Sequence, residues 1–72
     1  MSKNGVIRRN IELHPQAAER LERLKDKLEA PSDSEVLRRA LKVLEQLVED
    51  QEAGKRVLVR EPNGDLVAVR VI

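Results

Sequence analysis

The stretch VIRRNIELHPQ, residues 6–16, decides the fold predicted for this chain. Its first eight residues follow a period of two, which is typical of a β-strand with one apolar face. The pattern ends at His14-Pro15, because proline fits the first turn of a helix and disfavours helix in the residue before it. The next strand-like sequence begins only after residue 54. The backbone N–H and C=O groups of this strand therefore need a partner from elsewhere.

A second copy of the same strand would supply that partner. One face of the strand holds Ile7, Arg9, Ile11 and Leu13, and the other holds Val6, Arg8, Asn10 and Glu12. Two strands paired antiparallel would form a ribbon with one apolar and one mostly polar face. A ribbon of this width fits the major groove of DNA, where arginine pairs with guanine, asparagine with adenine and glutamate with the cytosine amine. The alternative to base reading is that Arg8 and Asn10 are ordinary solvent-facing residues.

Two helices are predicted after the strand. Apolar residues at helical spacing (Ala17, Leu21, Leu24 and Leu28) define the first helix, and Ala30-Pro31 ends it. Ser32 opens the second helix with Glu35 three residues later, the capping-box pattern, and Gly54 ends it. The apolar residues of the second helix cover an arc of roughly 160°. So wide an arc favours contact with both the first helix and another protomer.

Residues 55–72 are predicted to form a β-hairpin. The turn is Pro62-Asn63-Gly64-Asp65, and the return strand runs over residues 66–72. This hairpin would extend a dimer core, dock on the second helix, pair with another dimer through its edge strands, or bind a protein partner.

The composition favours an obligate oligomer. The 72 residues contain no cysteine, one histidine and no aromatic residue, so disulfides, thiolate or histidine-cluster metal sites and aromatic burial are excluded. Ordering a chain of this length costs on the order of 100 kcal/mol, and aliphatic side chains alone must offset it. Association with another chain is the remaining source of stability.

The charges and motifs give little support for an enzyme. We find no cysteine nucleophile and no glycine-rich phosphate loop, and the carboxylates lie at solvent-face positions of the predicted helices. His14 is interpreted as a capping or surface residue, with a metal ligand or base as the alternative. We therefore expect no catalytic residue, metal or cofactor. Without a long apolar run or signal-peptide pattern, we expect a cytoplasmic protein with no membrane contact.

The order strand, helix, short loop, helix resembles the ribbon-helix-helix (Arc/MetJ/CopG-like) family of DNA-binding proteins. The likeness covers about residues 6–50 and rests on RRNIELHP (8–15) and SDSEVLRRAL (32–41). It implies an α+β homodimer in which Arg8, Asn10 and Glu12 read bases. It also implies that backbone N–H groups at Ser32, Asp33 and Ser34 hold a DNA phosphate. Lys3 and Arg9 are expected to contact further phosphates.

The resulting prediction is a homodimeric transcriptional repressor that binds double-stranded DNA, with higher-order assembly on DNA. Its parts are a flexible arm (1–5), a ribbon-helix-helix domain (6–54) and the hairpin (55–72), which belongs to or docks on that domain. The expected dimer core consists of Ile7, Ile11, Leu13, Val36, Leu37, Ala40, Leu44 and Leu47. The alternative is an antitoxin-like or adaptor module whose hairpin binds a protein partner.

Overall fold

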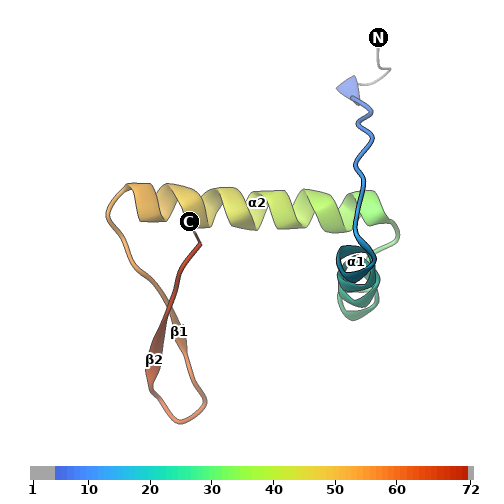
Figure 1. Ribbon diagram of the computed structural model, residues 1–72. Helices are drawn as coiled ribbons and strands as arrows, with labels where there is room; N and C mark the ends of the chain where they lie inside the picture. The colour runs from blue at the N-terminus through green and yellow to red at the C-terminus, as the bar shows by residue number, and fades with distance from the viewer. Residues whose placement is uncertain (1–4, 72) are drawn as a thin grey trace.

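A computed structural model describes residues 5–71 and shows an α+β chain with two helices and one two-stranded antiparallel sheet. The elements are α1 (Pro15–Leu28), α2 (Asp33–Glu52), β1 (Val57–Arg60) and β2 (Leu66–Val69). Figure 1 shows α1 at the N-terminal end of α2 and the hairpin at its other end. Two helices followed by a two-stranded antiparallel sheet are confirmed, whereas the strand predicted at residues 6–13 does not form in the single chain.

Local chemistry sets the helix boundaries as expected. Pro15 is the first residue of α1, and His14 before it has extended backbone. Glu29 ends α1 with a φ of 52°, a left-handed conformation that glycine adopts more easily. Gly54 follows α2 with a φ of 82°, where a side chain would be strained. Each helix therefore begins and ends within a residue or two of its predicted limits.

The hairpin has the predicted turn and a shorter return strand. Val57 pairs with Val69 and Arg60 with Leu66, and the return strand ends at Val69, before the predicted residue 72. In the turn, the Asn63 side chain accepts a hydrogen bond from the Asp65 N–H at 3.0 Å, and Gly64 has a φ of 95°.

Very little of the described chain is buried. Val36, at 2% exposure, is the one residue of the described range that counts as buried. It lies on α2, which contacts α1 near one end and β1 near the other, whereas α1 and the hairpin make no contact within residues 5–71. Neither helix in this range has the length and apolar content that a membrane span needs. Residues 5–71 of a single chain thus form no closed core of their own.

Candidate nucleic-acid interface

Residues 6–13, hereafter the arm segment, form neither helix nor strand in the single chain. In the view of Figure 1 they run in an extended path from the start of α1 past the N-terminal end of α2. Their backbone N–H and C=O groups make no backbone hydrogen bond with any other described residue. The arm segment also does not pair with the hairpin, because the sheet contains β1 and β2 only. The backbone of the arm segment therefore lacks hydrogen-bond partners within the described residues, as the sequence predicts. The partner strand itself stays a prediction.

The side chains of the arm segment are all exposed, including the apolar ones. Ile7 is 73% exposed, Ile11 65% and Leu13 47%. Arg8, Asn10 and Glu12 are exposed as well, and they have no ion pair among the described residues. Arg9 is exposed in the same way, and Lys3 lies outside the described residues. The three predicted base-reading side chains thus lie on one short extended stretch that is open to a ligand.

The start of α2 has the geometry of a capped helix with free amides. The Ser32 hydroxyl accepts a hydrogen bond from the Glu35 N–H at 3.2 Å, and the Ser32 carbonyl accepts from Val36 N at 3.4 Å. The N–H groups of Asp33 and Ser34 have no acceptor among the described residues. Unpaired N–H groups at a helix N-terminus attract anions. These two N–H groups are therefore free to donate to an anion, and the predicted phosphate contact stays a prediction.

Lys25 on α1 neutralises the carboxylate at this helix end. Its Nζ lies 3.0 Å from Asp33 Oδ1 and 3.2 Å from Glu22 Oε1. The hydrogen bond to Asp33, followed by the one to Glu22, raises the pKa of Lys25 above its ordinary value. The sequence predicts Asp33 at the phosphate site without this partner. The sequence signal for the Lys25–Asp33 ion pair is indirect, because two residues that pair across a loop have no fixed spacing in the sequence.

The Glu35 side chain does not complete the predicted capping box. Its carboxylate binds Arg38 at 2.7 Å and Arg39 at 3.3 Å, and the serine half of the box forms alone. The hydrogen bond from Arg38 lowers the pKa of the Glu35 carboxyl, and partial burial opposes that shift. Both arginines lie one turn further along α2, at helical spacings that favour opposite charges. Glu35 therefore orients two cations near the start of α2.

The predicted dimer-core residues of α2 lie mostly open in the single chain. Val36 is buried and Leu47 is half-buried, whereas Leu37 and Leu44 are 41% and 49% exposed. Ala40 is exposed between them.

Scans of family models, curated proteins and solved structures find no match to this chain.

Proposed function

We propose that the protein is a homodimeric, sequence-specific DNA-binding regulator of the ribbon-helix-helix type, acting as a repressor. The observation that carries the proposal is the arm segment, which is extended, exposed and without backbone partners within the described chain. An exposed row of unpaired N–H and C=O groups is a template for another strand. Two arm segments would satisfy each other and place their polar side chains on one face.

The size of the surface supports association. The chain exposes 7028 Å², whereas a folded monomer of 8.2 kDa exposes about 4,500 Å². Its radius of gyration is 15.6 Å, against about 11 Å for a compact domain of this length. The excess of about 2,500 Å² is roughly three times what one partner buries in a standard interface. A second copy that covers the apolar arm and α2 would remove much of that excess.

Charge selects one register for the proposed ribbon. In an antiparallel pair of strands, two facing residues place their side chains on the same side of the ribbon, and side chains alternate between the two sides along each strand. The two apolar faces therefore lie on the same side only when the residue numbers of each facing pair add up to an even number. With Asn10 facing Asn10, Arg8 of each chain faces Glu12 of the other, giving two favourable cross-strand pairs. Shifting the centre to Arg9 would place two guanidinium groups opposite each other. We therefore place the two-fold axis at Asn10.

This register gives Glu12 a role beside DNA. A carboxylate that faces a polyanion is unfavourable alone, but here it would hold the Arg8 guanidinium across the ribbon. Arginine has five N–H donors, so it can bind this carboxylate and still donate to guanine O6 and N7. The amides of Asp33 and Ser34 would bind a phosphate, with the Asp33 charge neutralised by Lys25. Base reading and backbone contact then come from separate elements.

Selection of bound sequences from random DNA, followed by gel shifts at several salt concentrations, tests the proposal. Arg8→Ala and Asn10→Ala should each weaken binding by roughly 1–3 kcal/mol and relax specificity at one position. Arg20→Ala, which removes an exposed cation of α1, is the matched control and should leave specificity unchanged. A two-fold symmetric selected site is expected. The absence of any enriched sequence at low salt would contradict the proposal.

A second candidate function is an interaction module, antitoxin-like or adaptor-like, that binds a protein through the hairpin. Exposed apolar side chains on both strands favour it: Leu58, Val59, Leu66, Val67 and Val69 are 40–54% exposed. Removing residues 55–72 should then abolish copurification of a partner and leave DNA binding intact. DNA selection without any enriched site, together with a stoichiometric partner lost on this deletion, would make this function the primary one.

A further inference from the structure

From its middle to its C-terminal end, α2 has an apolar stripe with an acidic border. Leu41, Leu44 and Val48 recur at helical spacing, and Leu41 and Leu44 are 66% and 49% exposed. With Lys42 and three acidic side chains, Glu45, Glu49 and Glu52, they line a shallow hollow of about 640 Å³. None of these three carboxylates has an ion pair among the described residues. The hollow also has no hairpin residue in its lining.

One face of the hairpin has the complementary chemistry. Two cross-strand pairs lie on this face, Leu58 opposite Ala68 and Arg60 opposite Leu66. Because side chains alternate along a strand, Arg56 and Arg70 are expected on the same face. We call this the arginine face. Leu58 and Leu66 are 48% and 54% exposed, and the three arginines form no ion pair within residues 5–71. Within the paired strands, the opposite face consists of the four valines Val57, Val59, Val67 and Val69.

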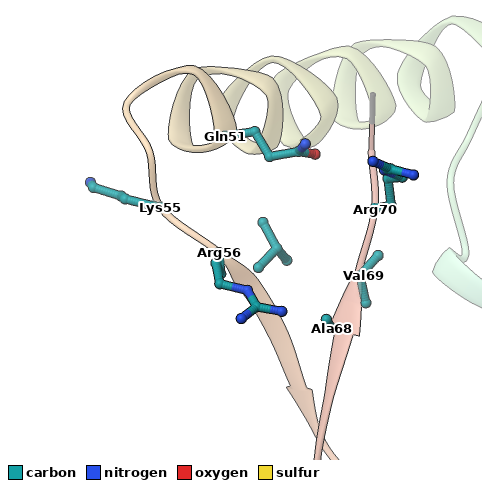
Figure 2. Close-up of a pocket in the computed structure, with 7 residues that line it drawn as sticks. Gln51, Lys55, Arg56, Ala68, Val69 and Arg70 are labelled. Carbon is teal, nitrogen blue, oxygen red and sulfur yellow. The ribbon is translucent and has the colours of Figure 1, made fainter.

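The upper end of the arginine face is open beside α2. Figure 2 shows Arg56, just before β1, and Arg70, just after β2, below Gln51 of α2, with Lys55 pointing away. These residues line a hollow of about 330 Å³ that contains no carboxylate in its lining. Lys55 pairs instead with Asp50, at 3.6 Å. The positive charges of Arg56 and Arg70 are therefore available to an acidic surface.

We propose that the arginine face of one chain docks on the Leu41–Leu44–Val48 stripe of a second copy, reciprocally. Three arginines would then meet three glutamates, and Leu58 and Leu66 would cover the exposed leucines. The lengths agree, because Glu45 to Glu52 spans about 10 Å of helix and Arg56 to Arg60 about 13 Å of strand. A reciprocal contact of this kind is closed by two-fold symmetry. It shares Leu44 with the predicted dimer core, but it uses neither the arm segment nor DNA, so its tests do not depend on the proposed function.

Two charge-reversed variants test this contact. The hairpin variant has Arg56→Glu, Arg60→Glu and Arg70→Glu, and the helix variant has Glu45→Arg, Glu49→Arg and Glu52→Arg. In either variant alone, like charges face each other. In a mixture, each hairpin meets a helix of opposite charge in the other variant, so both contacts are restored. Mixed assemblies should exceed the statistical level of random mixing, as measured by native mass spectrometry. A statistical distribution would overturn the proposal, because a hairpin that docked on its own α2 would give no selection.

Cross-linking provides a second readout that tolerates a change in stability. The chain has no cysteine, so Val48→Cys in one protein and Leu58→Cys in another provide the only thiols. Mixing the two with a short bismaleimide should give a mixed covalent dimer. The control pairs Leu58→Cys with Arg23→Cys on the exposed side of α1 and should link much less. Equal yields in the two mixtures would overturn the proposal and leave the arginine face to a different partner.

Discussion

Replacing Ile11 with alanine tests whether the arm segment is paired with a second copy or remains unpaired. In the single chain, Ile11 is 65% exposed and Val6 is 60% exposed, so the two side chains are open to solvent to nearly the same extent. The proposed ribbon distinguishes them, because Ile11 lies on the face that packs on the helices and Val6 on the opposite face. Ile11→Ala should therefore weaken the dimer, and Val6→Ala should not.

The expected size of the effect follows from the exposure of Ile11. Fully burying an isoleucine side chain contributes about 1.5–3 kcal/mol, so burying the exposed 65% contributes about 1–2 kcal/mol per chain. Each dimer contains two copies, which gives about 2–4 kcal/mol. The dissociation constant of the dimer should then rise roughly 30- to 1,000-fold. Any cavity left in the core would add to the loss.

Sedimentation equilibrium gives the dissociation constants, and denaturant unfolding at several protein concentrations gives an independent check, because the stability of an obligate dimer depends on concentration. Val6→Ala is the matched control within the same segment. If Ile11→Ala and Val6→Ala change dimer stability equally, or if neither changes it, the assignment of the two faces is wrong.

Three further changes test local features of the fold. Ser32→Ala should lower the free energy of unfolding by about 1 kcal/mol through loss of the cap, whereas Ser32→Gly should cost only a few tenths, as thermal unfolding can measure. Gly64→Ala should destabilise the chain by about 1–2 kcal/mol because φ is 95°, and a smaller loss for Gly64→Asn is the check. The lowered pKa of Glu35 means that its stabilising contribution is complete above about pH 4.5 and disappears as the pH falls through the lower folded-state value. The stability difference between the wild type and Glu35→Gln should therefore shrink in acid, and a constant difference would show that the Arg38 pair is not formed.

The sequence determines the helices and the turn because their signals are local. Pro15, Ser32, Gly54 and Gly64 act on their immediate neighbours, and the structure has each of them at the expected boundary or turn. The apolar spacing of α2 likewise predicts a contact with α1, which is confirmed. These features need no knowledge of distant residues.

The remaining features depend on residues that are far apart or on another chain. The return strand ends at Val69, where the backbone leaves its partner, and the Val71 N–H binds the Gln51 side chain at 2.8 Å instead. No local pattern predicts that contact, nor the Lys25–Asp33 pair between the helices. The arm segment follows the same rule, since its alternation indicates a strand and residues 5–71 of a single chain provide no strand beside it.

Cysteine substitution at the proposed two-fold axis tests the ribbon most directly. In the proposed register, Asn10 faces Asn10 with Cα atoms about 4.5–5.5 Å apart, within the range that a disulfide spans, and the chain has no other cysteine. Val6→Cys is the control, because its two copies would be about 26 Å apart along the ribbon. Under mild oxidation, Asn10→Cys should form a disulfide-linked dimer in high yield on a non-reducing gel, and Val6→Cys should remain monomeric on the same gel. Equal yields from the two variants, or no dimer from Asn10→Cys, would contradict the pairing of the two arm segments.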